Sequence, residues 1–396
     1  MDPALRRAFN AAFSEEKYRA VVRQLDDELG FPMPFRISET PIFLTPELTA
    51  ELAAAAEEIV AAVTAPEYLA AAERAVPPEL AVPGAEGRPP FVQVDFALAE
   101  GEGGRVEPRL IELQAFPSLY AFQWLLDRIY REHYDIAPGL VGYFDGLDHD
   151  GYAARLRETI VADCDPEEVV LLEIEPERQK TRPDFAATER LLGVRSVDVR
   201  EVAERGGRLS YRRDGREVPI RRLYNRVIFD ELVRRGLPRA PLFTEPLDAV
   251  WVGHPNWYFR ISKFSLPFLR SRYAPRAHFV SDLAALPDDL GDYVLKPLYS
   301  FAGLGVELDV TPERLAALPR PEEWILQRKV VYAPAIETPD GPAKAEVRMM
   351  FLGTDRLRLV NSLVRISKGA MMGVDFNKAK TWVGASVAYH PPLPED

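Results

Sequence analysis

The stretch Phe91-Val-Gln-Val-Asp-Phe-Ala-Leu98 and the stretch Arg109-Leu-Ile-Glu-Leu113 decide the fold class. Both are rich in β-branched, aromatic and other apolar residues, and Glu-Gly-Glu-Gly-Gly at 100–104 lies between them. Glycine-rich connections of this kind are typical of turns between neighbouring strands. We therefore expect the two stretches to pair as a β-hairpin.

The predicted hairpin carries three side chains with oxygen donors, Asp95, Glu112 and Gln114. Alternation places Glu112 and Gln114 on one face of their strand, and an antiparallel partner brings Asp95 beside them. Mg²⁺ prefers hard oxygen ligands, usually one or two carboxylates completed by water and nucleotide phosphates. The trio is thus a candidate magnesium site. The alternative reading, polar residues on the open face of a sheet, stays open at this point.

Outward from the hairpin, the pattern divides the chain into four segments. Residues 1–90 read as a helical N-terminal segment, because apolar residues recur at intervals of three and four, and 91–150 hold the hairpin and a helix from Tyr120 to Tyr130. Residues 151–246 alternate strand and helix, which favours an α/β lobe, and 247–396 read as an α+β sheet lobe.

The lobe at 151–246 should contain strands at Val169–Ile174, Ser196–Val199, Arg208–Arg212 and Val218–Leu223, and a helix at Asp184–Leu192. The last segment should contain strands at Asp292–Lys296, Gly305–Leu308, Trp324–Gln327, Glu346–Leu352 and Arg358–Val364, and helices at Ile261–Arg270 and Pro312–Leu318.

Composition and charge narrow the functional classes. The 396 residues suffice for two or three domains' worth of core, and 47% hydrophobic with 28% charged residues is an ordinary globular balance. A formal charge of −12 argues against nucleic acid and anionic membrane as partners. The single cysteine, Cys164, permits no intrachain disulfide, and we find neither a signal peptide nor a membrane span, so we expect a cytoplasmic protein. The oligomeric state stays open.

A second group of residues follows the predicted strand that ends at Lys296. The turn after it contains Ser300, Gly303 and Gly305. Backbone N–H groups of such a turn can cradle phosphate oxygens while a lysine neutralises them, although the order is not that of a Walker A loop. The alternative is a hairpin with an exposed lysine and turn glycines.

The strand Trp324-Ile-Leu-Gln-Arg-Lys-Val330 lies about thirty residues further along the chain. Leu326, Gln327 and Val330 could line a flat aromatic ring such as adenine. Arg348 and Arg365 stand on the two predicted strands that follow, and the fork of an arginine suits phosphoryl oxygens. Lys263 precedes the Lys296 strand at the start of a predicted helix.

Taken in order, these elements resemble the circularly permuted ATP-grasp family, which includes glutathionylspermidine synthase and eukaryotic glutathione synthetase. The resemblance covers roughly Phe91 to the C-terminus. It matches the family's metal-binding hairpin, substrate-side α/β lobe, helix-borne lysine, lysine strand with its glycine turn, adenine-binding hinge strand and late arginine strands. The residues that carry the match are Asp95, Glu112, Gln114, Lys263, Lys296, Pro297, Gly303, Gly305, Arg348 and Arg365.

The resemblance implies a carboxylate–amine ligase that consumes ATP with Mg²⁺, forms an acyl phosphate and releases ADP and phosphate. It implies that Lys263 and Lys296 hold the α- and β-phosphates and that Asp95, Glu112 and Gln114 hold Mg²⁺. Arg365, with Arg348 nearby, is expected at the acyl phosphate. Residues 91–150 would then be the metal-binding part, 151–246 the substrate lobe and 247–396 the nucleotide-binding lobe.

Two basic stretches in the substrate lobe are candidates for binding carboxylates of an amino-acid or peptide-like substrate. Arg178, Lys180 and Arg182 belong to one, and Asn225 and Arg226 to the other. The alternative for each is an ordinary solvated loop, and Arg226 fits it least because its neighbours are apolar.

Two departures from the family pattern keep other functions open. Gln114 replaces the usual Asn, and no acidic residue follows Lys296 where some relatives carry a metal ligand. The alternatives are an ATP-grasp phosphotransferase and a non-catalytic ATP-grasp-like scaffold that binds a peptide.

Overall fold

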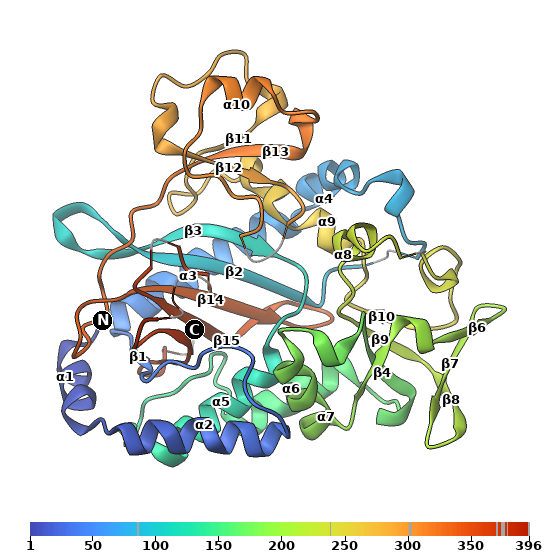
Figure 1. Ribbon diagram of the computed structural model, residues 1–396, viewed down its shortest axis with the longest axis horizontal. Helices are drawn as coiled ribbons and strands as arrows, with labels where there is room; N and C mark the ends of the chain where they lie inside the picture. Colours follow the sequence, from blue (N-terminus) through green and yellow to red (C-terminus); the bar gives the residue numbers. More distant parts are fainter. Residues whose placement is uncertain are drawn as a thin grey trace.

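The computed structural model is a mixed α/β structure built around one five-stranded sheet (Figure 1). It describes residues 1–84, 87–237, 239–300, 303–369, 371–373, 377 and 379–394. Among these residues, no helix combines the length and the apolar character needed to cross a bilayer.

The central sheet is antiparallel, in the order β16-β15-β14-β2-β3. The predicted hairpin is confirmed, because β2 pairs with β3 and places Asp95 opposite Glu112. Its partners come from the far end of the chain, so the segments 91–150 and 247–396 share one sheet. The strands are β2 (Phe91–Glu100), β3 (Val106–Gln114), β14 (Lys344–Leu352), β15 (Arg358–Ser367) and β16 (Gly384–Ser386).

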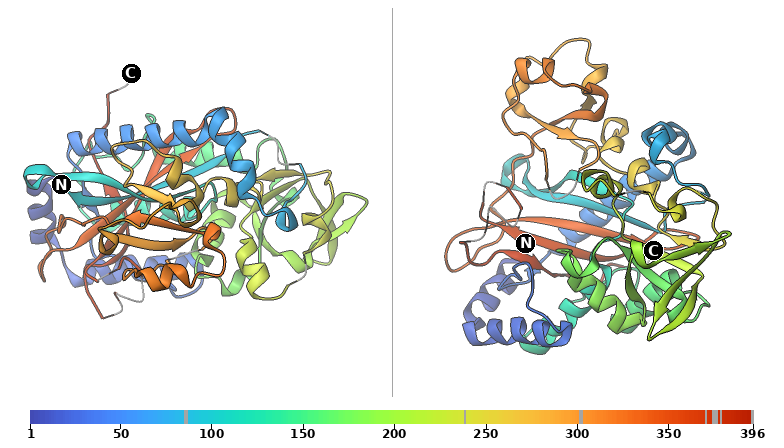
Figure 2. Two further views of the ribbon diagram at one scale, coloured as in Figure 1. Left: turned by 90° about the horizontal axis from the view of Figure 1, so that it is seen from above. Right: turned by 45° about the vertical axis from the view of Figure 1, so that its right-hand side comes forward.

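The two faces of the central sheet differ in chemistry. On one face, apolar side chains such as Val94, Phe96 and Val347 pack with helix α3 (Pro46–Thr64) in the main hydrophobic core. Figure 2 shows α3 running along the strands on this side. Because side chains alternate along a strand, the opposite face carries polar residues, and they are buried as well: Gln93, Asp95, Glu346, Arg348 and Asn361.

The helical N-terminal prediction is confirmed. Thr45 caps α3, with Pro46 at its first position, and the Oγ1 atom of Thr45 accepts the N–H of Leu48. The short strand β1 (Ile42–Phe43) pairs in parallel with β17 (Ala388–Tyr389), which ties this segment to the C-terminal region. The other helices of the segment are α1 (Pro3–Ala12), α2 (Glu15–Leu29) and α4 (Pro66–Ala72).

The middle lobe has the predicted α/β alternation. Its four-stranded parallel sheet runs β10-β9-β4-β5, and a small antiparallel sheet, β6-β7-β8, projects beside it (Figure 1). The single strand expected at Val218–Leu223 is wrong, because the chain bends at Arg221 and the two halves join different sheets. The strands are β4 (Val169–Glu173), β5 (Arg195–Asp198), β6 (Ala203–Arg205), β7 (Arg208–Arg213), β8 (Arg216–Ile220), β9 (Arg222–Asn225) and β10 (Val250–Val252). Helices α5 (Tyr120–His133) and α6 (His149–Ile160) precede β4 in the chain, and α7 (Arg182–Leu192) and α8 (Phe229–Arg234) follow it.

A small lobe of three strands and helix α10 (Pro312–Ala316) stands over the β3 edge of the central sheet (Figure 1). It contains β11 (Ala277–Phe279), β12 (Tyr293–Pro297) and β13 (Trp324–Arg328) in the antiparallel order β11-β13-β12. The predicted strand at Gly305–Leu308 is wrong, since only Glu307 forms an isolated bridge, with Leu295. The α-helix predicted over Ile261–Arg270 is also wrong: α9 (Trp257–Arg260) is followed by a 3₁₀ helix, Lys263–Phe268, with Pro267 inside it.

Candidate functional site

The polar face of the central sheet holds a group of buried charges centred on Asp95. The Nε and Nη2 atoms of Arg348, on the neighbouring strand, donate to the two carboxylate oxygens at 2.6 and 2.7 Å. Arg365, one strand further, adds a third bond at 2.7 Å. The central sheet thus brings Asp95 into contact with two arginines that are about 250 and 270 positions away in the sequence.

The two arginines decide the charge state of Asp95. Burial alone would raise the pKa of its carboxyl group, but the charges of Arg348 and Arg365 outweigh burial and hold that pKa below its usual range. Its side chain is 2% exposed. Taking such charges out of water costs free energy that ion pairing only partly returns, so a buried group of this kind is a candidate functional site.

Glu346 extends the same polar face and was missed by our sequence analysis. Its carboxylate accepts the hydroxyl of Tyr332 and forms an ion pair with Arg365 at 2.7 Å. Burial raises its pKa, against the opposing charge of Arg365. The signal was present in the sequence, because Glu346 and Arg348 are two residues apart on one strand and must share a face.

Lys263 and Lys296 bring two further cations to the β3 edge. The Nζ atom of Lys263 donates to the Ser300 carbonyl at 2.7 Å and lies 3.8 Å from Glu112 Oε2. Lys296 donates to the carbonyl of Ile111 at 3.1 Å. Burial, and then the charge of Lys263, lower the pKa of Lys296 to about 8, against the opposing effect of Glu112.

A bulge in the hairpin creates the contact with Lys296. Ile111 is the extra residue of β3, because Asp95 faces Glu112 whereas the next residue, Phe96, faces Leu110. Bulges re-aim groups next to functional sites. Because of the bulge, the Ile111 carbonyl accepts a hydrogen bond from Lys296, and Glu112 stays on the polar face.

The prediction that Asp95, Glu112 and Gln114 hold Mg²⁺ meets an obstacle at Asp95, which both arginines already engage. Across the described part of the chain, no three His, Cys, Asp or Glu side chains are grouped to hold a metal ion. Gln114 uses its amide N–H₂ toward Gln93 and Phe116, which leaves its oxygen for other partners. Glu112 and Gln114 line a small cavity of about 30 Å³ together with Lys263 and Ser300. One carboxylate and one amide oxygen fit Mg²⁺ only if phosphates and water supply the other ligands.

The glycine turn and the predicted hinge strand lie in the small lobe. Gly303 and Gly305 have φ of +76° and +75°, a left-handed conformation that favours glycine, while Phe301 and Ala302 lie outside the described residues. Leu326 packs into the core below α10, so its side chain faces away from the central sheet. Gln327 donates to the Leu110 carbonyl at 3.3 Å, and Val330 is half-buried just beyond the strand.

The structure separates the predicted substrate-binding residues into two places. Arg226 is 2% exposed and pairs with the buried Asp184 at 2.6 Å, close to the rings of Phe116 and Phe185. Asp184 also accepts the backbone N–H groups of Leu119, Ala121 and Phe122 at the start of α5. Arg226 therefore holds a helix cap in place, and its Nε atom has no partner among the described residues. The side chain of Asn225 is buried too and accepts the N–H of Val227 at 3.1 Å.

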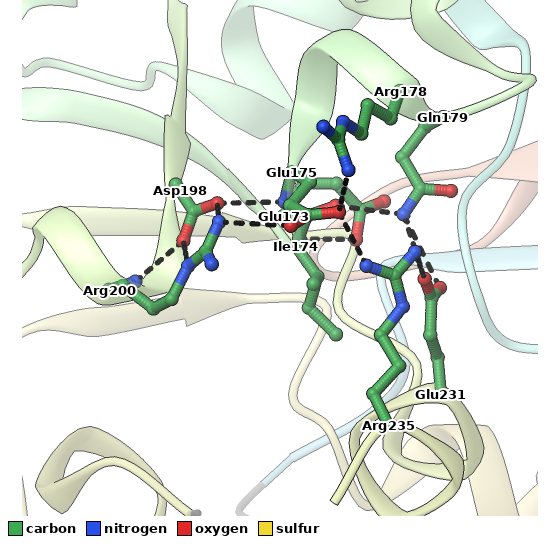
Figure 3. A network of polar contacts seen from close by, with 9 residues as sticks. All are labelled: Glu173, Ile174, Glu175, Arg178, Gln179, Asp198, Arg200, Glu231 and Arg235. Carbon is green, nitrogen blue, oxygen red and sulfur yellow. Dashed lines mark hydrogen bonds and ion pairs between the residues drawn. The ribbon is translucent and has the colours of Figure 1, made fainter. Parts of the chain in front are cut away.

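The other three candidates lie at the surface, at the carboxyl end of β4. Arg178, Arg200 and Arg235 reach Glu175 from different elements, as Figure 3 shows. Arg182 pairs with Glu177 and lies over the ring of Phe31, and Lys180 is exposed. The chain thus brings Asn225 and Arg226 toward the hairpin and leaves Arg178, Lys180 and Arg182 outside.

Comparison with known proteins gives a fold-level result. No model of a protein family matches the chain, and no curated protein matches it. A solved structure, "a glutathione synthetase like-effector (GSS30) from Globodera pallida in apoform", matches with a TM-score of 0.52 and 10% identity, over 96% of this chain and 100% of that chain. The chain is therefore similar in fold to a glutathione synthetase-like protein. A likeness at this identity concerns the fold alone.

Proposed function

We propose that the protein is an ATP- and Mg²⁺-dependent carboxylate–amine ligase with a circularly permuted ATP-grasp architecture. The observation that carries the proposal is the convergence of four cations and three carboxylates on one buried sheet face and its β3 edge. They are Lys263, Lys296, Arg348, Arg365, Asp95, Glu112 and Glu346. The fold-level similarity to a glutathione synthetase-like protein supports the same proposal.

The residues suit phosphoryl transfer, which depends on positioning and charge neutralisation more than on a nucleophilic side chain. Lys263 and Lys296 stand at the junction of the central sheet and the small lobe, where they would hold the α- and β-phosphates. Mg²⁺ would neutralise the phosphate oxygens when bound. Glu112 and the amide oxygen of Gln114 would hold it, while Asp95 would position Arg348 and Arg365.

Arg365 is placed to meet an acyl phosphate. Its side chain is 33% exposed, whereas Arg348 is 10% exposed and fully engaged with Asp95 and Gln93. We therefore assign the contact with the acyl phosphate to Arg365 and a positioning role to Arg348. Ser300, Gly303 and Gly305 would lie along the phosphates, and the end of the hinge strand at Val330 would lie near the adenine.

The proposed substrates are an amino-acid or peptide-like carboxylate and an amine, bound toward the middle lobe. Phe116 connects the two regions, since its carbonyl accepts the Gln114 amide and its ring lies 5.5 Å from the Arg226 guanidinium.

A second candidate function is a non-catalytic scaffold that binds a peptide. The observation that favours it is the engagement of Asp95 by two arginines, which leaves Glu112 as the carboxylate of the trio without a close hydrogen-bonded cation.

The experiment is a measurement of ADP release from Mg-ATP with pools of amino acids, small peptides and polyamines. The ligase predicts release that requires both a carboxylate and an amine, and release that Glu112→Gln and Lys296→Ala abolish. Lys329→Ala is the matched control, because that lysine lies on the same lobe and its ammonium donates to the exposed Gly291 carbonyl. Carboxylate-dependent release without an amine would indicate a phosphotransferase. Folded Glu112→Gln and Lys296→Ala proteins that turn over ATP like the parent would refute the ligase site.

A further inference from the structure

A second cavity lies in the middle lobe, away from the polar face of the central sheet. It has a volume of about 520 Å³ and is lined by all four residues of β5, Arg195–Asp198. Volumes of this size are typical of sites for small ligands. The cavity continues past the carboxyl end of β4 at Glu175 and under Tyr211 and Arg212 of β7.

The strand that forms one wall has an open edge. β5 is the last strand of its sheet, and in the described part of the chain only β4 pairs with it. An open edge presents backbone N–H and C=O groups that an extended peptide can pair with. A β5 of four residues corresponds to about 13 Å at about 3.3 Å per residue.

Positive charge stands at the amino end of β5. Arg195 begins the strand, and Arg212 of β7 lines the same cavity. Neither arginine has an ion-pair partner among the described residues. Arg212 donates only to the carbonyl of Gly215, at 2.8 Å. Glu189 of α7 also lines the cavity.

The carboxyl end of the same strand carries three carboxylates, and arginines pair with two of them, Asp198 and Glu175. Asp198 and Glu175 are joined, since Asp198 accepts the N–H of Glu175 at 2.8 Å, and Arg200 pairs with both carboxylates (Figure 3). Glu201 lines the cavity next to them without an ion-pair partner in the described part of the chain. Glu175 has a φ of +45°, which is uncommon for a residue other than glycine and is found disproportionately at functional sites.

The geometry points to a binding site for a short peptide of about four residues with free termini, extended antiparallel to β5. Its C-terminal carboxylate would lie between Arg195 and Arg212, and its terminal ammonium would lie toward Glu201. Antiparallel addition is required by the charges, because parallel addition would place the ammonium against the two arginines. This site is independent of the proposed ligase activity, since none of its residues lies on the central sheet.

The experiment is calorimetric titration of the full chain with tetraalanine in the absence of nucleotide. A charge-assisted hydrogen bond contributes about 1.5–3 kcal/mol, so amidation of the peptide's C-terminus should weaken binding by about tenfold or more. The double variant Arg195→Ala/Arg212→Ala should weaken the binding of unmodified tetraalanine by the same factor. Amidation of the peptide should then no longer change its affinity for this variant. Arg205→Ala, an exposed arginine on β6 outside the cavity, should bind like the parent.

Pairing with the strand edge has its own test. Tetraalanine N-methylated at all three of its peptide bonds cannot donate a peptide N–H to β5 and should lose measurable binding. The proposal is overturned if tetraalanine does not bind, if the amidated peptide binds the parent protein equally well, or if the double variant binds like the Arg205→Ala control. The comparison of the two peptides on the parent protein needs no variant, so it holds even if a substitution disturbs folding.

Discussion

Two groups of ion pairs in this molecule use the same residue types at opposite degrees of exposure. On the central sheet, the Asp95–Arg348 pair has side-chain exposures of 2% and 10%. Around Glu175, the partner arginines Arg178 and Arg200 are 79% and 55% exposed. Buried charges cost free energy unless they are fully paired, whereas exposed pairs contribute little to stability. Burial of the charges, and not the number of ion pairs, therefore marks the polar face of the central sheet as the place of a catalytic function.

The largest expected effect tests the buried group. Asp95→Asn leaves Arg348 without a carboxylate and leaves Arg365 with Glu346 alone. We therefore expect a loss of about 3–5 kcal/mol in the free energy of unfolding. Urea denaturation followed by circular dichroism measures it. Asp145→Asn is the control, since Asp145 pairs with Arg358 of β15 at 3.0 Å in an exposed position. Equal losses in the two variants would contradict the account.

A somewhat smaller effect is expected at the other buried pair. Asp184→Asn should destabilise the protein by about 3 kcal/mol, because Arg226 loses its counter-charge while the amide oxygen can still cap α5. Mg-ATP affinity should not change, since this pair lies in the middle lobe. A loss of nucleotide affinity in the folded variant would show that the pair belongs to the nucleotide site.

The hairpin residues of the candidate site and the glycine turn after Lys296 could be predicted from the sequence, because both depend on local patterns. Alternation placed Glu112 and Gln114 on one face of a hairpin, and turn chemistry identified the glycines after Lys296. What could not be predicted was the pairing of β2 with β14, since nothing local records a contact between Asp95 and Arg348 across about 250 residues.

The wrong element predictions have local causes as well. Pro267 interrupts the apolar pattern that predicted a helix over Ile261–Arg270, and the chain forms a 3₁₀ helix there. The bulge at Ile111 shifts the register by one residue, which periodicity alone does not reveal. Arg178 was a candidate for binding a substrate carboxylate, and nothing local in the sequence recorded its pairing with Glu175 at the surface.

A third prediction concerns pH and Lys296. Since the pKa of Lys296 is lowered to about 8, its ammonium is partly neutral above that pH, and bound phosphate should raise the pKa again. Binding of Mg-ATP should therefore take up a proton near pH 8, and affinity should fall as the pH rises through about 8. Calorimetry in two buffers with different heats of ionisation measures the uptake. Identical heats in both buffers would contradict this prediction.

The smallest effect is expected in the exposed group. Glu175→Gln removes one charge from a network that water already screens, so the free energy of unfolding should stay within experimental error of the parent. Thermal unfolding monitored by circular dichroism measures it. A loss as large as that of Asp95→Asn would remove the contrast between the two groups.

The most direct test of the central claim is a titration of the protein with Mg-ATP, before and after removal of the two buried lysines. We expect the parent and Lys329→Ala to bind Mg-ATP. The Lys263→Ala/Lys296→Ala protein should bind it at least about tenfold more weakly, because each charge-assisted hydrogen bond contributes about 1.5–3 kcal/mol. Equal affinity in the folded double variant and the parent would contradict the assignment of the nucleotide to the β3 edge of the central sheet.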